Sequence, residues 1–331
     1  MSKLKDDINS EVDKLKDWKK SYFFDIRTAR QRADDGYKLP EPKKIFDEFH
    51  VEGEVGILFS PVNVGKSILA AQIAIILSTG KSIGGFTTTA GKMKVLFYEL
   101  ELSDKQFSKR VSGFELNENF YVATSADSYD DSEDIDKFLE RKLEEIFNIA
   151  VQGNFQHLII DNLTWLLQDA EKGKAAARFM KKLHTFNRKT GITILVVSHT
   201  PKRDITLPIT MYDLYGSSML GNFVDHAFCV VESVSEPKLR YIKQVKVRLA
   251  EKKYDINNVM LAKIRSDGDK VYLQFIGYDN EYNHLKQASE ERLQERKKMA
   301  KKMDSEGKTK IEIAKELNTS VRTAYRILAD K

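Results

Sequence analysis

Between Glu54 and Val231, short apolar runs alternate with longer stretches in which apolar residues recur every three or four positions. The short runs predict β-strands, and the longer stretches predict helices that pack on them. This alternation is typical of an α/β fold with a mostly parallel sheet that is flanked by helices on both faces. The predicted strands are residues 55–60, 94–101, 157–161 and 192–199, and the predicted helices are residues 66–79, 103–111, 133–150 and 174–190.

After Asp225 the pattern changes, because strand-like runs then follow one another without helices between them. Asp267 and Gly268 provide a turn signal between the last two runs. We therefore expect antiparallel strands on the C-terminal side of the core. These predicted strands are residues 226–232, 238–248, 257–264 and 269–278.

Two polar segments flank this core. The first segment, residues 1–38, has helical spacing of the apolar residues Ile8, Val12, Leu15, Trp18 and Tyr22. The sequence LPEP that follows it breaks the helix and predicts a linker. The last segment is again helical in pattern. We expect three regions: a helical N-terminal arm with its linker (1–42), a core domain (43–285) and a helical tail (286–331).

The net charge of +5 belongs entirely to the tail. From Lys286 to Lys331 the sequence has 13 Lys and Arg residues and 8 Asp and Glu residues, and the rest of the chain has 41 charges of each sign. A neutral body with a basic tail favours binding of the tail to a polyanion. An ordinary solvated helix would have a similar composition, so that alternative stays open.

Composition and terminal sequence indicate a soluble protein in a reducing compartment. The single cysteine, Cys229, cannot form an internal disulfide, and its apolar neighbours indicate a buried strand residue rather than a nucleophile. The N-terminal sequence lacks the apolar core of a signal peptide. The longest apolar stretch, residues 68–77, is interrupted by Gln72 and is too short to cross a membrane. We expect a cytoplasmic protein without a membrane partner.

The segment SPVNVGKS, residues 60–67, matches the phosphate-binding pattern G-x-x-x-x-G-K-[ST] except that Ser60 replaces the first glycine. In such a loop, backbone N–H groups and the following helix N-terminus hold phosphate oxygens, and the second glycine permits the tight curl. We expect Lys66 to bind phosphate and the Ser67 hydroxyl to ligate Mg²⁺. The residues expected to contact ATP are Asn63, Val64, Gly65, Lys66, Ser67 and Ile68.

Two further carboxylates fit an ATPase. Asp161 ends the apolar run HLIID, where a Walker B carboxylate would hold Mg²⁺ through water. Asn162 follows it instead of a glutamate, so the general base has to come from another strand. The run VLFYELELS contains Glu99 and Glu101, which we expect on one strand face. We favour Glu101 as the base that orients the attacking water, although a solvated glutamate at a strand end is the alternative.

With a glutamate one strand before Walker B, residues 45–280 resemble the RecA-like ATPases, in particular the RepA-type and DnaB-type hexameric helicases and the RepA-like ATPases of plasmids and mobile elements. The run VLFYELELS aligns the family's catalytic glutamate with Glu101. The resemblance implies that His199 senses the γ-phosphate from a strand between the P-loop and Walker B strands. It also implies that the K-x-R pair Lys246 and Arg248 completes the active site of a neighbouring subunit. A solvated edge strand is the alternative for that pair.

In these ATPases the loops after Walker B and after the sensor line a central channel and contact single-stranded DNA. Here those loops contain cations for phosphate and aromatic side chains for base stacking. Aromatic residues also anchor loops onto a core, so both roles stay open for them. The cations are Lys172, Lys174, Lys202 and Arg203, and the aromatic residues are Trp165, Tyr212 and Tyr215.

The end of the tail resembles the helix-turn-helix modules of resolvases and sigma-like regulators. Its first helix would have the apolar face Ile311, Ile313, Ala314 and Leu317, and its second the face Val321, Ala324 and Leu328. Thr319 or Ser320 would cap the second helix. That helix would present Arg322, Thr323 and Arg326 to duplex DNA.

Together these features imply a RecA-like ATPase domain with ATP and Mg²⁺ as cofactors and DNA as partner, with single strands in the pore and duplex on the tail. The expected protein is a hexameric helicase or translocase that serves the replication or mobilisation of a plasmid or mobile element. The alternative is an ATP-switched DNA-binding regulator or initiator that does not translocate. An assembly protein with a degenerate ATP site, suggested by Ser60, is a third reading.

Overall fold

The computed structural model describes residues 25–124, 135–163, 172–214, 218–248, 251–286, 290–317, 319 and 321–329. The chain divides into two compact units, residues 1–42 and 43–331. The first unit contains α2 (Ala29–Tyr37), which begins with a capping box between Thr28 and Gln31 and has no buried residues. The apolar positions predicted for the N-terminal arm, from Ile8 to Tyr22, lie outside the described residues.

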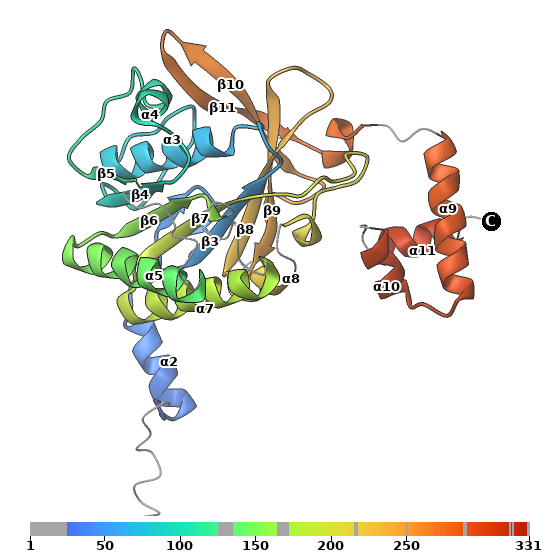
Figure 1. Ribbon diagram of the computed structural model, residues 1–331, viewed down its shortest axis with the longest axis horizontal. Coiled ribbons are helices and arrows are strands. Elements are labelled where there is room, and N and C mark those ends of the chain that lie inside the picture. The colour runs from blue at the N-terminus through green and yellow to red at the C-terminus, as the bar shows by residue number, and fades with distance from the viewer. Residues whose placement is uncertain are drawn as a thin grey trace, which may run out of the picture. The chain divides into compact units, whose positions relative to one another are not determined.

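The second unit is built around a nine-stranded sheet (Figure 1). Its strands are β3 (Val55–Ser60), β4 (Val95–Glu99), β5 (Phe120–Ala123), β6 (His157–Asp161), β7 (Thr193–His199), β8 (His226–Glu232), β9 (Leu239–Val247), β10 (Val259–Asp267) and β11 (Lys270–Asp279). Their order is β11-β10-β9-β8-β3-β7-β6-β4-β5. Neighbours from β8 to β5 are parallel, and those from β8 to β11 are antiparallel. β1 (Lys44–Phe46) and β2 (His50–Val51) form a separate hairpin.

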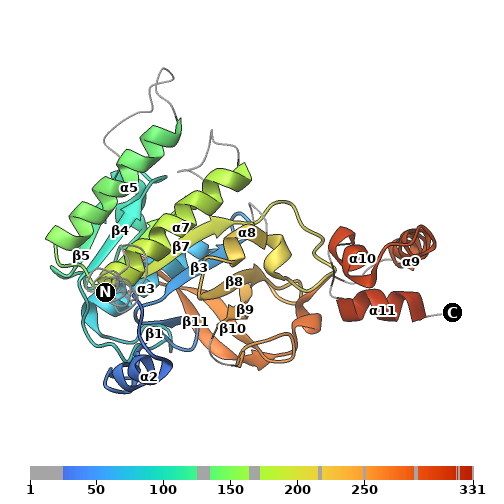
Figure 2. The same cartoon turned by 90° about the horizontal axis from the view of Figure 1, so that it is seen from below.

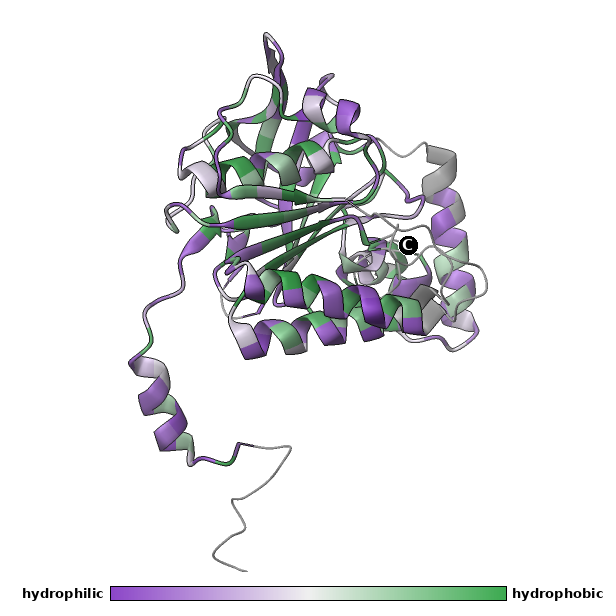
Figure 3. Ribbon diagram, turned by 60° about the vertical axis from the view of Figure 1, so that its left-hand side comes forward, coloured by the Kyte–Doolittle hydropathy of each residue, from purple (hydrophilic) through white to green (hydrophobic). Residues whose placement is uncertain are grey.

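Helices cover both faces of this sheet. The helices α5 (Ile135–Gln152) and α7 (Lys172–Thr190) lie side by side on one face, and α3 (Lys66–Thr79) lies on the other (Figures 1 and 2). The shorter elements are α4 (Asp104–Arg110), α8 (Ser218–Gly221) and the 3-10 turns η1 (Met211–Asp213) and η2 (Glu281–His284). The strands between the two helical layers are predominantly hydrophobic (Figure 3).

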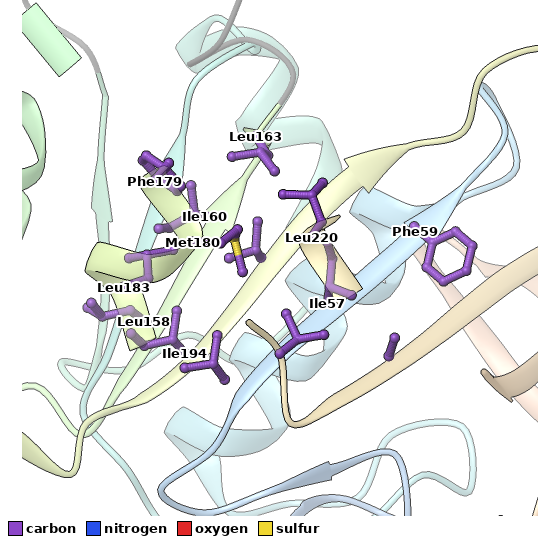
Figure 4. Packing of buried hydrophobic residues seen from close by; sticks show 14 of the residues in the cluster. Ile57, Phe59, Leu158, Ile160, Leu163, Phe179, Met180, Leu183, Ile194 and Leu220 are labelled. Atoms are coloured by element: carbon purple, nitrogen blue, oxygen red, sulfur yellow. The ribbon is translucent and has the colours of Figure 1, made fainter. Parts of the chain in front are cut away.

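Alternating residues of each buried strand face the two helical layers. Ile57 and Phe59 of β3 belong to the cluster that includes α5 and α7 (Figure 4), whereas Leu58 packs with α3. Gln72, which interrupts the apolar run of α3, is buried and bonds to both backbone groups of Leu273 in β11, at 2.9 and 3.0 Å. This amide therefore fastens α3 to the antiparallel part of the sheet.

The predicted fold class is confirmed: the core is α/β, with a mostly parallel sheet, flanking helices and antiparallel strands on the C-terminal side. The strand predicted over residues 94–101 is shorter, because the chain leaves the sheet after Glu99. The partly exposed edge strand β5 and the β1–β2 hairpin were not predicted. Cys229 is fully buried in β8, and burial raises the pKa of its thiol. Within the described ranges, no helix has the length and apolar character needed to span a membrane.

The described part of the tail forms three helices, α9 (Glu290–Ser305), α10 (Lys310–Glu316) and α11 (Val321–Ala329). They enclose a small apolar cluster that contains Ala300, Ile313, Ala314, Leu317 and Ala324. Ile311, predicted on the apolar face of α10, is instead 65% exposed. Val321 is also exposed, so the buried face of α11 is formed by Ala324 with the partly buried Ile327 and Leu328. Ser320, one of the two predicted caps, lies outside the described residues.

Three buried histidines form a hydrogen-bonded chain at the amino ends of the parallel strands. His226 Nδ1 lies 3.0 Å from Glu54 Oε2, His226 Nε2 lies 2.5 Å from His50 Nδ1, and His50 Nε2 lies 2.8 Å from His157 Nε2. Neutral rings satisfy every link if His226 donates to an ionised Glu54, His50 donates to His226, and His157 donates to His50. The buried Nδ1 of His157 is then an acceptor without a partner among the described residues. Gly56 is required here, because a Cβ at that position would lie 2.0 Å from His226 Nε2.

The burial of these histidines predicts that acid destabilises the fold. Burial lowers the pKa of His157 to about 3, while a histidine in the unfolded chain titrates near 6.5. The unfolded state therefore binds more protons below pH 6.5, and the stabilisation present above that pH is lost as the pH falls. Between pH 7 and pH 5, His157 alone should account for a loss of about 2 kcal/mol in the free energy of unfolding.

Denaturant unfolding of the unaltered protein and of His157→Gln, each at pH 7 and pH 5, measures this loss in the free energy of unfolding. The comparison cancels other titrating groups, and glutamine can still donate to His50 without titrating. An equal loss of stability in both proteins between pH 7 and pH 5 would contradict a neutral His157.

Candidate functional site

The residues predicted to bind ATP and Mg²⁺ converge with Glu101 and His199 on one edge of the sheet, at the carboxyl ends of β3, β7, β6 and β4. In the strand register, Ser60 is paired with His199, and Glu99 is paired with Asp161. His199 therefore flanks the start of the phosphate-binding loop. The predicted position of its strand, between the P-loop and Walker B strands, is also observed.

The loop after β3 has the backbone geometry that phosphate binding requires. Asn63 has φ +60° and Gly65 has φ +107°, a conformation in the left-handed half of φ space that favours glycine. Gly65 caps α3 without any side-chain hydrogen bond, so the N–H groups of the first helical turn are open to an anion. Ser60 does not have a positive φ, and its buried hydroxyl donates to the Pro61 carbonyl at 2.8 Å. A small serine thus fits the position where the motif has glycine.

A buried arginine supports this loop from outside the motif. Arg240 of β9 donates from Nε to the Val64 carbonyl at 2.7 Å and pairs with Glu232 at 3.0 Å. The contact gives the Val64 carbonyl a donor, which it needs because an acceptor cannot bind a phosphate oxygen. Sequence reasoning missed this residue because β9 lies far from the loop in sequence.

Lys66 and His199 are in direct contact. Lys66 Nζ lies 3.0 Å from His199 Nε2, and the lysine is 6% exposed. Burial lowers the pKa of Lys66, and the charges of Asp161 and Glu101 oppose that shift. Burial and the neighbouring Lys66 charge lower the pKa of His199, which favours the neutral ring. A lysine in this position can move to an anion that is held by the loop.

Asp161 fits the role of a carboxylate that acts on a metal ion. It is 2% exposed, and neither of its oxygens has a hydrogen-bond partner in the described structure. Burial raises its pKa to about 6, and the charge of Lys66 and the nearby Ser67 hydroxyl oppose that shift. Other buried polar atoms without described partners lie at the same edge, namely Glu99 Oε2, His199 Nδ1 and Thr200 Oγ1. Unsatisfied polar groups concentrated in this way suit a bound ion and nucleotide, and Ser67 and Asp161 are the candidate Mg²⁺ ligands.

Glu99 and Glu101 have different environments. Glu99 is 3% exposed, and its Oε1 accepts the backbone N–H groups of Glu101 and Leu102 at 3.1 and 3.0 Å. Glu101 lies beyond the end of β4 and its side chain is 42% exposed, with Oε1 3.9 Å from His199 Nε2. The expected arrangement on one strand face is therefore wrong, because Glu99 shapes the turn on which Glu101 projects. The geometry favours Glu101 as the base.

Two polar residues of the site were not predicted to act there. Asn162 is buried, and its Nδ2 lies 2.5 Å from Glu101 Oε1 and 3.2 Å from His199 Nε2. Arg110, the last residue of α4, is close enough to lower the pKa of Lys66 and of Asp161. For Arg110 the available signal was its position on the helix that directly follows Glu101.

Lys246 and Arg248 lie at the opposite edge of the sheet. Val247 is paired with His226, which is paired with Gly56 at the amino end of β3. From there to Ser60 the strand spans about 13 Å, so neither cation reaches the loop of its own chain. Lys246 Nζ donates to the carbonyls of Gly221 and Val224 at 2.6 Å. Arg248 is the residue after the end of β9, and its guanidinium lies 2.6 Å from the carboxylate of Asp225.

The predicted DNA-contacting cations of the loop after β7 differ in their availability. Lys202 is exposed. The Arg203 side chain is 4% exposed, pairs with Asp213 at 3.3 Å and donates to the Leu207 carbonyl. This geometry argues against a contact between Arg203 and a DNA phosphate, because the guanidinium organises its own loop. Tyr212 is 51% exposed, whereas Trp165, Tyr215 and the side chains of Lys172 and Lys174 lie outside the described residues.

The predicted recognition residues are on α11. Arg322 and Arg326 are exposed, and Thr323 is half-buried. The two arginines are four residues apart and therefore lie on the same side of the helix.

A match to a protein family agrees with an ATPase domain. No curated protein matches the chain in sequence. Among solved structures, the chain is similar to a KaiC-like protein from the hyperthermophilic archaeon Pyrococcus horikoshii OT3, with 15% identity, a TM-score of 0.47 and coverage of 69% of this chain and 93% of the other. The AAA domain family matches residues 24–204, more than half of the chain, and this range contains the phosphate-binding loop, Glu101, Asp161 and His199. The chain carries a P-loop ATPase domain, and it belongs to the AAA domain family.

Proposed function

We propose that the chain is a Mg²⁺-dependent ATPase that acts on DNA as a head-to-tail oligomer. The simplest form is a hexameric ring of the RepA-like helicase or translocase type, serving the replication or mobilisation of a plasmid or mobile element. The observation that carries this proposal is the position of Lys246 and Arg248 on the sheet edge opposite the phosphate-binding loop. A heterologous interface would bring that edge of one subunit to the phosphates of the next.

The proposed chemistry assigns a role to each residue at the carboxyl edge. Residues 63–68 and Lys66 would hold the phosphates of ATP, and Ser67 and Asp161 would hold Mg²⁺, whose charge offsets that of the phosphate oxygens. Glu101 would accept a proton from the attacking water, and His199 would contact the γ-phosphate through Nε2. Arg248 and Lys246 of the adjacent subunit would neutralise the charge that develops on the transferred phosphoryl group.

DNA is the proposed partner because two cations of the tail and one cation of the loop after β7 are exposed where a polyanion can reach them. The tail holds the whole net charge of +5, and Arg322 and Arg326 are exposed on α11. This supports the reading of α10 and α11 as a helix-turn-helix that binds duplex DNA. Lys202 is exposed in the loop after the sensor strand, where it could contact single-stranded DNA.

The second candidate is an ATP-switched DNA-binding regulator or initiator. The burial of Arg203 favours it, because this removes one of the two cations proposed for the loop after β7. In that case the tail would supply the affinity for DNA, and ATP would change the state of the protein without translocation.

Single-stranded DNA should raise the ATPase rate severalfold, and nucleotide should shift the mass of the protein to a multiple of the 38.0 kDa chain. Steady-state hydrolysis with a thymidine oligonucleotide, combined with light scattering, measures both. Lys202→Glu should weaken binding of the oligonucleotide and lower the slope of log affinity against log salt by about 0.7 or more. The matched control is Lys189→Glu, an exposed lysine at the end of α7. An unstimulated monomer that still binds duplex DNA would favour the regulator.

A further inference from the structure

We infer that Asn162 is a positioning residue that holds Glu101 at a fixed place relative to His199. The inference rests on the proposed role of Glu101 as the base. Asn162 is fully buried directly after Asp161, and its amide nitrogen Nδ2 lies 2.5 Å from Glu101 Oε1 and 3.2 Å from His199 Nε2. One amide group therefore contacts both the residue that would activate water and the residue that would contact the γ-phosphate.

The direction of these hydrogen bonds follows from the groups involved. Lys66 Nζ and Asn162 Nδ2 can only donate, and both approach His199 Nε2. Nε2 therefore accepts, and the ring proton is on Nδ1, which is buried without a described partner. The carboxylate of Glu101 also accepts from Asn162. An aspartate at position 162 would have the same shape but would place acceptors against acceptors at both contacts.

Glu101 needs such support because its side chain projects from a turn and is partly exposed. It lies on the turn beyond β4, and its side chain is 42% exposed, whereas Asn162 is fully buried next to the end of β6. Without the amide, the glutamate side chain can occupy several rotamers, and a smaller fraction of complexes has the base in line with the attacking water. ATP affinity depends mainly on the loop at residues 60–67, so the effect should fall on turnover.

The test is a double-mutant cycle. Asn162→Ala should lower kcat about tenfold to a hundredfold, with the Kd for ATP changed less than about threefold. In a Glu101→Gln background, Asn162→Ala should cause little further loss of kcat, because the residue that it positions no longer acts as a base. Asn162→Asp, which keeps the side-chain volume, should be at least as impaired as Asn162→Ala.

Asn187→Ala is the matched control. Asn187 is also a buried asparagine, but its amide bonds to the carbonyls of Gly53 and Ile192 away from the site. Its replacement should lower stability without lowering kcat per folded molecule. If the two losses of kcat multiply in the double mutant, Asn162 acts independently of Glu101 and the inference is overturned. Full activity of Asn162→Asp would overturn it as well. If Glu101→Gln itself remained active, the base assignment would fail together with this inference, whereas an inactive Glu101→Gln beside a fully active Asn162→Ala would refute the inference alone.

Discussion

Arg248→Ala should bind ATP as tightly as the unaltered chain but hydrolyse it on the order of a thousandfold more slowly, the typical loss when an arginine finger is removed. Binding should be retained because Arg248 lies at the edge of the sheet opposite its own phosphate-binding loop. Turnover should fall because the transferred phosphoryl group loses a cation that the adjacent subunit supplies. Equilibrium binding of a fluorescent ATP analogue and steady-state hydrolysis measure the two effects separately.

Mixing two inactive proteins tests whether this cation acts between subunits. Arg248→Ala retains Lys66, and Lys66→Ala retains Arg248, so a mixed head-to-tail oligomer contains interfaces in which both are intact. In an equal mixture roughly one quarter of the interfaces should be of this kind. Activity should therefore rise well above that of either protein alone.

Arg265→Ala is the control for the loss of an arginine from the antiparallel part of the sheet, because Arg265 is exposed on β10 and bonds only to Gln274 among the described residues. It should hydrolyse ATP normally. If the mixture stays inactive while subunit exchange is demonstrated, Arg248 has no role between subunits. Arg110, which already affects the charges of Lys66 and Asp161 within one chain, would then be the cation to examine.

Glu101→Gln should retain ATP binding and lose about a hundredfold to ten-thousandfold in kcat, the usual contribution of a general base. Glu99→Gln should keep most of its activity. Its Oε1 accepts two backbone N–H groups, and a glutamine carbonyl can accept the same bonds. The pair is a matched comparison, since both substitutions remove one carboxylate charge near Lys66.

Single-turnover hydrolysis with bound ATP isolates the chemical step for both variants. The opposite ranking, with Glu99→Gln inactive and Glu101→Gln active, would move the base to the buried carboxylate and make Glu101 a surface residue. Thermal unfolding of both proteins checks that Glu99→Gln has not lost the turn that carries Glu101.

The sequence was informative where local pattern and motif coincide. β3 and α3 were predicted to the residue, because a buried apolar run, a glycine-containing loop and a long apolar helix follow one another directly. β4 was predicted too long, since an alternating ELE pattern does not reveal that the chain turns after Glu99. The histidine chain and the Arg240 contact could not be predicted, because their partners are brought together by strand order and lie more than a hundred residues apart.

Exposure was the least predictable property of the site. Arg203 and Lys202 are neighbours in one loop, and nothing in the sequence distinguishes a guanidinium that binds Asp213 from an exposed ammonium. Glu99 and Glu101 are a similar case, because the two backbone N–H groups that bind Glu99 become available only after the chain turns. Residue type thus indicated the proposed chemistry of the site, and packing determined which of two similar side chains is available for it.

The strand β9 has a consequence for how successive ATP sites communicate. Near its start, Arg240 holds the Val64 carbonyl of the chain's own phosphate-binding loop, and at its other end are Lys246 and Arg248. In the proposed head-to-tail oligomer, this single strand of about 27 Å would link the nucleotide bound by its own chain to the nucleotide bound by the next subunit. A shift of the loop after hydrolysis would move the strand along its axis and so displace the two cations at the neighbour's phosphates. Such coupling would allow the sites of a ring to hydrolyse ATP one after another.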